Sequence, residues 1–144
     1  MPAKVILLVE DSADDEALMR RALKKHKVEG EMVVARDGAQ AVEYLLGAAA
    51  QSNGRVATPT VVFLDLKLPK LGGLEVLERI RADERTRLIP VVILTSSSEE
   101  KDIAAGYRLG ANSYVRKPVD LDAFVEVVRS IDSFWLAIVK LPPE

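Results

Sequence analysis

Short apolar runs alternate along this chain with stretches of helical periodicity. The first run, Val5–Val9, consists of five consecutive apolar residues and is rich in β-branched side chains. Such runs are typical of strands that are buried on both faces of a parallel sheet. A second strand is predicted at 31–36, where the more polar pattern favours a position near the sheet edge. Three further strands are predicted at 60–64, 90–94 and 112–115.

Each predicted strand is followed by a helical pattern. Over residues 14–27 this pattern places Ala17, Leu18, Ala22 and Leu23 on an apolar side, with Arg and Lys side chains opposite. Further helices are predicted at 39–46, at roughly 74–83, from Ser98 to near Gly110, and from Asp120 onward. Residues 47–59 are rich in small and polar side chains, which predicts a surface loop.

Five alternations of strand and helix predict an α/β fold, in which a parallel sheet carries helices on both faces. The length of 144 residues fits one domain, and 49% hydrophobic residues can supply its core. We expect a single domain over 1–144 and no output domain.

Composition and charge exclude several classes of function. A formal net charge of −2 argues against a general nucleic-acid binder, which needs a basic surface. The chain has no cysteine and His26 is its only histidine, so thiol chemistry and a histidine-based zinc site are excluded. The N-terminal residues run directly into a short strand that ends in acids, which is neither a signal peptide nor a membrane span. We therefore expect a cytoplasmic protein.

The residues just after the predicted strands include three acids, a hydroxyl and an amine. They are Glu10, Asp11, Asp65, Thr95 and Lys117. Ligands of open parallel sheets bind beyond the carboxyl ends of the strands, so these side chains should gather at one edge. Clustered carboxylates repel one another unless a cation joins them, and Mg²⁺ is the hard, oxygen-preferring ion that fits. In such a site Asp65 can act as a nucleophile and form an acyl phosphate, with Lys117 and Thr95 stabilising the transferred group.

Each of these residues also has an ordinary structural interpretation. Glu10 and Asp11 can simply cap a helix, and an aspartate at a strand end, such as Asp65, is commonly a turn residue. Thr95 can belong to a loop, and Lys117 can be solvated. The functional interpretation depends on all of them falling at the same edge in one order.

At this point the sequence closely resembles the response-regulator receiver family, over residues 4–128. The resemblance is carried by Leu8-Val9-Glu10-Asp11, Phe63-Leu64-Asp65-Leu66-Lys67-Leu68-Pro69, Gly72-Gly73, Thr95-Ser96, Tyr114 and Lys117-Pro118. It implies a flavodoxin-like fold of five strands and five helices. It also implies a signalling protein rather than an enzyme.

The resemblance further implies a role for each site residue. A partner histidine kinase would donate a phosphoryl group to Asp65. Glu10, Asp11 and Asp65, with the backbone carbonyl of Lys67, would hold Mg²⁺, and Lys117 would pair with the phosphate. The acidic pair here is Glu-Asp, a variation that the family tolerates.

Three features refine this expectation. The Lys117-Pro118 peptide should be cis, a state that fixes the direction of the lysine. Thr95 and Tyr114 should form a switch, in which the hydroxyl moves toward the phosphate and the aromatic ring turns inward. Lys67 replaces the commoner Met or Asn, so we expect a changed phosphate lifetime.

The C-terminal segment from about 120 to 144 is unusually apolar. Leu121, Phe124 and Val128 begin one stripe of a predicted helix, and 134–139 contains no polar side chain. This segment can fold back on its own domain. We favour an interface, since large apolar patches on soluble proteins mark association sites, and expect a homodimer. The interface residues would be Phe134, Trp135, Leu136, Ile138 and Val139.

This tail and the long loop at 47–59 resemble the small receivers that serve bacterial and cyanobacterial phytochromes, which implies a phytochrome-type kinase and an unidentified downstream protein as partners. Three other classes stay open. A phosphatase of the haloacid dehalogenase type needs an acid where Lys67 stands, and a flavodoxin needs a phosphate loop where Glu10 and Asp11 stand. A pseudo-receiver would lack acids that are present here.

Overall fold

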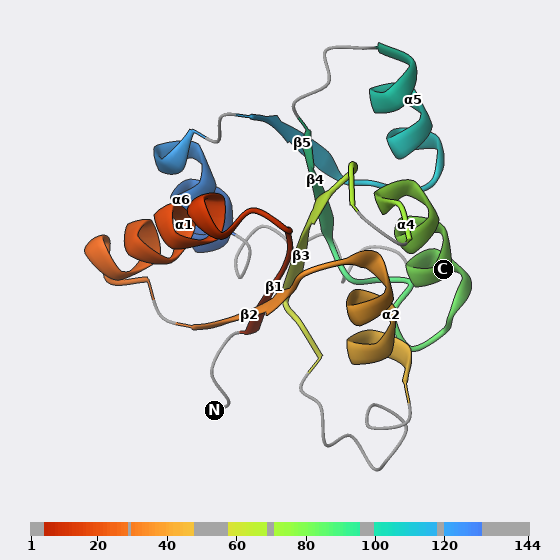
Figure 1. The fold of residues 1–144 in the computed structure, drawn as a ribbon, viewed down its shortest axis with the longest axis horizontal. Helices are drawn as coiled ribbons and strands as arrows, with labels where there is room; N and C mark the ends of the chain where they lie inside the picture. Colours follow the sequence, from red (N-terminus) through yellow and green to blue (C-terminus); the bar gives the residue numbers. More distant parts are fainter. Residues whose placement is uncertain are drawn as a thin grey trace.

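The computed structural model describes residues 5–28, 30–47, 58–68, 71–95, 100–117 and 120–130. Its centre is one parallel sheet with the strand order β2-β1-β3-β4-β5 (Figure 1). The strands are β1 (Val5–Val9), β2 (Glu31–Ala35), β3 (Val61–Asp65), β4 (Val91–Thr95) and β5 (Ser113–Arg116). All five agree with the predicted strands to within one residue, and β2 lies at an edge, as its polar sequence indicates.

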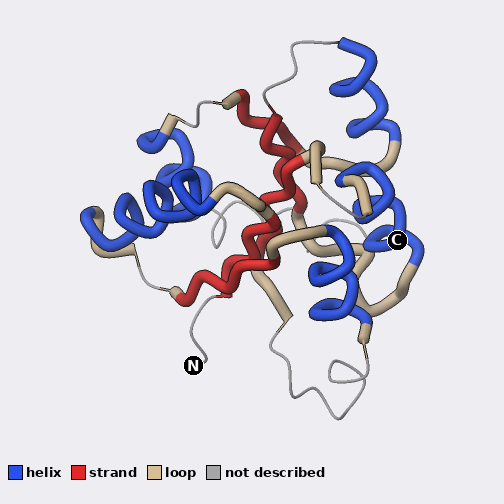
Figure 2. Tube along the Cα trace, viewed as in Figure 1, coloured by secondary structure: helices blue, strands red, loops and turns tan. Residues whose placement is uncertain are grey.

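Helices cover both faces of this sheet (Figure 2). They are α1 (Ala13–Lys25), α2 (Gly38–Leu46), α4 (Gly73–Ala82), α5 (Glu100–Arg108) and α6 (Leu121–Ser130). In Figure 1, α1 and α6 lie on one side of the sheet and α2, α4 and α5 on the other. The predicted α/β fold with five parallel strands is therefore confirmed. None of the described helices is long and apolar enough to cross a bilayer.

The two helical layers bury two separate cores against the sheet. On the side of α1 and α6, the ring of Phe63 meets the ring of Phe124 edge to face, with centroids 4.9 Å apart. On the other side, Val76, Leu77 and Ile80 of α4 pack against Leu64 and its neighbours. Both faces of the central strands are thus apolar, which explains why their sequence is a continuous hydrophobic run instead of an alternating one.

The apolar side predicted for the first helix is partly wrong. Ala17 and Leu18 are exposed, with Leu18 at 43% of its full area, whereas Met19 is buried together with Ala22 and Leu23. Positions 19, 22 and 23 share one helical face, and the same face contains position 15, four residues before Met19. The first turn of α1 therefore turns the carboxylate of Asp15 toward the sheet edge instead of toward solvent.

Helix caps answer one open question about the acidic pair. Ser12, not Glu10 or Asp11, caps α1, because its side chain accepts a hydrogen bond from the Asp15 backbone N–H. The predicted cap Asp120 accepts a hydrogen bond from the Ala123 backbone N–H at the start of α6. Neither acid at the end of β1 therefore serves as the N-cap of α1.

A close approach of backbones fixes the position of Asp65. Gly73 begins α4 beside the end of β3, and its N–H donates to the carbonyl of Leu66 over 3.1 Å. A Cβ atom at position 73 would overlap the Asp65 carbonyl oxygen and the Leu66 Cα. Only glycine permits this contact, so α4 can pack directly against the turn that follows β3.

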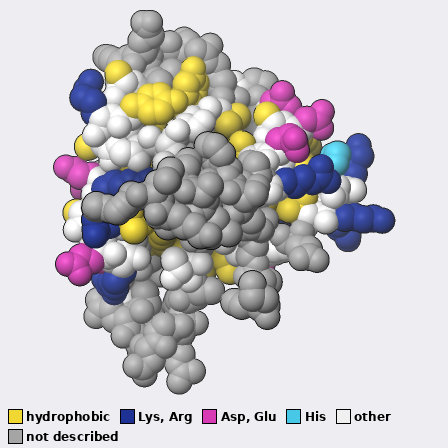
Figure 3. Space-filling view, turned by 180° about the vertical axis from the view of Figure 1, so that it is seen from behind, with side chains coloured by type: hydrophobic (Ala, Val, Ile, Leu, Met, Phe, Trp, Pro, Cys, Tyr) yellow, Lys and Arg dark blue, Asp and Glu magenta, His cyan; other side chains and the backbone are white. Residues whose placement is uncertain are grey.

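On the face seen in Figure 3, described basic and acidic side chains are interspersed. Those visible there form no continuous basic stripe of the kind that follows a nucleic-acid backbone.

Candidate functional site

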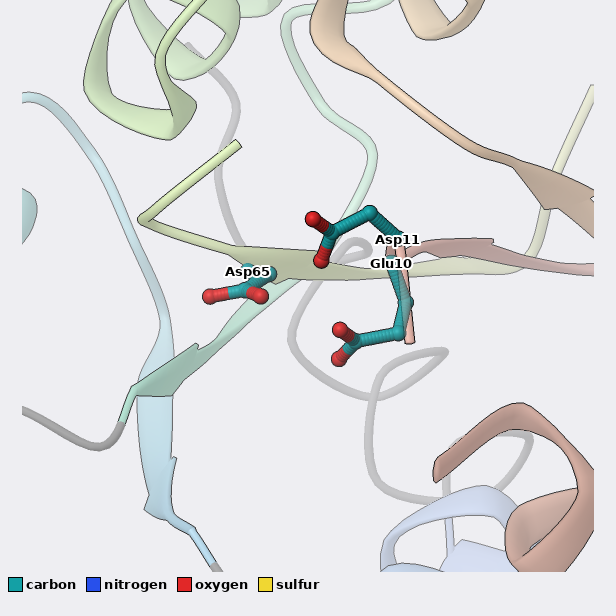
Figure 4. Close-up of side chains that lie close together, drawn as sticks. All are labelled: Glu10, Asp11 and Asp65. Atoms are coloured by element: carbon teal, nitrogen blue, oxygen red, sulfur yellow. The ribbon is translucent and has the colours of Figure 1, made fainter. Parts of the chain in front are cut away.

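Three carboxylates converge beyond the carboxyl ends of two neighbouring strands. Glu10 and Asp11 follow β1, and Asp65 is the last residue of β3. Because these strands pair in parallel, with Val9 opposite Leu64, their ends bring the acids together. One oxygen from each carboxylate lies within 4.8 Å of the other two (Figure 4). Glu10 and Asp65 are buried, whereas Asp11 is exposed.

Lys117 joins this cluster from the end of β5, the edge strand opposite β2. Its Nζ atom lies 2.6 Å from Glu10 Oε1, 3.1 Å from Asp65 Oδ2 and 3.2 Å from Asp15 Oδ2. Lys117 directly follows β5, which lies two strands away from β3 in the sheet. Only 16% of its side chain is exposed. Four residues from three strand ends and one helix thus form a single ionic cluster.

Burial and charge act in opposite directions on the two most buried members. Burial, reinforced by the negative charge of Asp65, raises the pKa of Glu10 to about 7, although Lys117 favours its ionised form. Burial also disfavours the ammonium of Lys117, but its hydrogen bonds and Coulomb attraction to Glu10 and Asp65 outweigh this and raise its pKa. Lys117 is therefore charged, while the carboxyl of Glu10 is poised between its two forms near neutral pH.

Asp65 is held by two contacts that leave its carboxylate oriented. Its Oδ1 atom accepts a hydrogen bond of 3.1 Å from the Lys67 backbone N–H, and its Oδ2 atom faces the Lys117 ammonium. The first contact belongs to the turn after β3, so the backbone of that turn sets the direction of the side chain. Such an oriented, nearly buried carboxylate next to a cation has the geometry of a nucleophile for phosphoryl transfer.

The donor set fits a hard divalent cation such as Mg²⁺. All three clustered side chains are carboxylates, the ligand type that this ion prefers. Glu10 Oε1 is buried and has no well-aligned hydrogen bond in the described part of the chain, although Lys117 touches it. A bound cation would give this oxygen a partner and relieve the repulsion between Glu10 and Asp65.

Other predicted site residues are described only in part. Thr95 ends β4, but its side chain lies outside the described atoms. Tyr114 lies in β5, is half-buried, and meets the ring of Tyr107 edge to face at 6.2 Å. Pro118, and with it the expected cis peptide, lies outside the described residues, as do the five expected interface residues within 134–139.

Two members of this neighbourhood were missed by the sequence analysis. Asp15 was not singled out, because a charged residue in the first turn of a helix is common for dipole reasons alone. Its spacing of four from the buried Met19 was the available signal. Tyr107 was also missed, since its ring contact with Tyr114 joins α5 to β5 across a turn.

Comparisons with known proteins agree with this geometry. The model of the response regulator receiver domain family matches residues 6–129. Response regulator Rcp1 of Synechocystis sp. (strain ATCC 27184 / PCC 6803 / Kazusa) is 41% identical over 141 residues, which cover 98% of this chain and 95% of Rcp1.

Solved structures resemble the chain over nearly its whole length. The bacteriophytochrome response regulator AtBRR is 44% identical with a TM-score of 0.77, covering 94% of this chain and 96% of AtBRR. The Mn²⁺-bound form of Rcp1 has a TM-score of 0.71 and 40% identity, over 97% and 99% of the two chains. The phosphorylated cyanobacterial phytochrome response regulator RcpA has a TM-score of 0.76 and 38% identity, over 95% and 96%.

Proposed function

Because this chain belongs to the response regulator receiver domain family, we propose that it accepts a phosphoryl group from a histidine kinase on Asp65. The observation that carries this proposal is the position of Asp65 at the end of β3. There its Oδ2 lies 3.1 Å from the Lys117 ammonium and its other oxygen accepts the Lys67 N–H. This arrangement combines a fixed nucleophile with a cation that can neutralise a transferred phosphoryl group.

In the proposed reaction an Asp65 carboxylate oxygen attacks the phosphorus of a phosphohistidine. A P–O bond forms, the P–N bond breaks, and the departing imidazole takes up a proton from solvent. Lys117 is already within contact distance of Asp65 Oδ2, so its ammonium can follow the charge onto the phosphoryl oxygens. Thr95, at the end of the neighbouring strand β4, is proposed to donate its hydroxyl to the same group.

Glu10, Asp11 and Asp65, together with the Lys67 carbonyl, are proposed to hold Mg²⁺. When bound, this ion would neutralise charge on the phosphoryl oxygens. The protein's own contribution is to keep three carboxylates close together before the ion arrives, with two of them buried. The crystal structure of Mn²⁺-bound Rcp1 supports this proposal, because Rcp1 is similar to this chain over nearly its whole length.

The donor is proposed to be a phytochrome-type histidine kinase, since the names of two solved structures similar to this chain, AtBRR and RcpA, refer to bacterial or cyanobacterial phytochromes. Phosphorylation would then switch Thr95 and Tyr114 and change the binding of a downstream protein, so the chain would signal without being an enzyme. A homodimer through the apolar segment 134–139, with cytoplasmic location, completes the proposal. Both features are inferred from the sequence, and segment 134–139 lies outside the described residues.

Acetyl phosphate with Mg²⁺, followed by intact-mass measurement, tests the proposal. We expect one adduct with the mass of a phosphoryl group, abolished by Asp65→Asn and retained by Asp14→Asn, which changes an exposed acid of α1. EDTA should also abolish it. No adduct on the unmodified protein would contradict the proposal and favour a pure interaction module.

A further inference from the structure

The α1 carboxylate of Asp15 is the member of the ionic cluster that the proposed chemistry does not use. Its Oδ2 lies 3.2 Å from Lys117 Nζ, yet it is not part of the three-carboxylate group that can hold a cation. Its side chain is 31% exposed, against 1% for Glu10 and 8% for Asp65. Asp15 is thus a third, rim-positioned partner for an ammonium that already has two buried ones.

Building on the proposed phosphoryl transfer, we propose that Asp15 is a positioning residue that competes with the phosphoryl group for the ammonium of Lys117. In the unphosphorylated protein it holds this ammonium toward α1. It thereby weakens the pairing between Lys117 and an anion on Asp65.

The competition arises because one ammonium contacts several carboxylates at once. The Nζ atom of Lys117 lies 3.1 Å from Asp65 Oδ2 and 3.2 Å from Asp15 Oδ2, so one ammonium contacts both carboxylates at nearly the same distance. A phosphoryl group on Asp65 would have to share this ammonium with Asp15. Glu10 also contacts this ammonium at 2.6 Å, so removing Asp15 does not leave Lys117 without a partner.

Exposure makes Asp15 the contact that is easiest to exchange. A half-exposed carboxylate can recover water when the ammonium leaves it, whereas a buried one loses its charge partner without compensation. The backbone of Asp15 is fixed by the Ser12 cap, and its helical face is fixed by the buried Met19. Asp15 is therefore a rigidly placed but weakly held partner, which suits a residue that tunes an equilibrium.

The experiment measures binding of beryllofluoride, an analogue of the phosphoryl group, to the full chain in Mg²⁺. Asp65 engagement is followed by the NMR signals of residues at the site. We expect Asp15→Asn to bind about 1.5- to fivefold more tightly than the unmodified protein, the range of a partly exposed charge contact. Asp14→Asn is the matched control, because it removes the same charge one position away, and no ion pair joins Asp14 to Lys117 in the described part of the chain.

A double-mutant cycle separates positioning from a structural effect. In a Lys117→Met background, Asp15→Asn should change affinity no more than Asp14→Asn does, because the shared ammonium is gone. Asp15→Glu should retain most of the native behaviour. Equal affinities of Asp15→Asn and Asp14→Asn, or an unchanged Asp15 effect without Lys117, would overturn the inference while leaving the proposed function intact. Absence of Asp65-dependent binding in the unmodified protein would instead contradict the proposed function.

Discussion

The ammonium of Lys117 lies 3.1 Å from Oδ2 of Asp65, although 52 positions separate the two residues along the chain. This contact joins the end of the edge strand β5 to the end of the central strand β3. It exists because parallel strands of equal direction end at the same edge, so a long side chain from one end can reach the others.

Replacing Lys117 with methionine should slow phosphorylation of Asp65 strongly. The volume of the side chain is nearly kept, but the cation that can follow charge onto the phosphoryl oxygens is lost, and such donors contribute about 10²–10³ in rate. The rate of adduct formation from acetyl phosphate measures this. Lys24→Met, on the exposed side of α1, is the control and should react at the native rate. A native rate in Lys117→Met would contradict the assigned role.

The metal-free protein should lose stability as the pH rises from about 4.5 to about 7. Burial raises the pKa of Glu10 from its ordinary value of 4.5 to about 7, so between these values the folded state binds a proton that the unfolded state has released. The free energy of unfolding therefore falls with rising pH, by about 1–3 kcal/mol in total for one shifted group of this kind. Urea titrations at pH 5 and pH 8 in EDTA measure the change.

Glu10→Gln should flatten this dependence because the titrating group is removed. Saturating Mg²⁺ should flatten it as well for the unmodified protein, since a cation favours the ionised carboxylate. A pH slope that persists in Glu10→Gln would assign the dependence to another group.

Lys67→Met should lengthen the lifetime of the phosphorylated state. Lys67 is exposed directly beside Asp65, where its ammonium can stabilise charge on the phosphoryl group as water attacks. Dephosphorylation after removal of the donor gives the rate, and Lys67→Arg, which keeps the charge, should stay close to native. Equal rates for Lys67→Met and the native chain would mean that this side chain does not influence hydrolysis.

Gly73→Ala should damage both stability and phosphorylation. A Cβ atom there would overlap the Asp65 carbonyl and Leu66, so the start of α4 or the end of β3 must move, at a typical cost of about 1–3 kcal/mol for overpacking. Gly72→Ala is a sharp control, because a Cβ at position 72 would meet no described atom within 4 Å. Unfolding midpoints and adduct formation of the two variants should differ clearly.

Much of the fold was predictable from local pattern. The apolar runs of β1, β3 and β4 are easily recognised as strands because both of their faces meet helices and are therefore apolar. The α1 face was predicted less well: Ala17 and Leu18 are apolar yet exposed, while Met19 points inward. Periodicity alone permits a rotation of this size when a helix is short and its apolar residues are adjacent.

The sequence by itself determined the family, the fold and the set of acids with their lysine, because these depend on motifs and on the alternation of strands and helices. Only the tertiary structure decided that Asp15 joins Glu10 and Asp65 around Lys117, that Ser12 and not the acidic pair caps α1, and that Gly73 must be glycine. The physical reason is that these features depend on the rotation of α1 and on backbone approaches between distant segments. Such relations arise when helices pack on the sheet, and no local pattern encodes them.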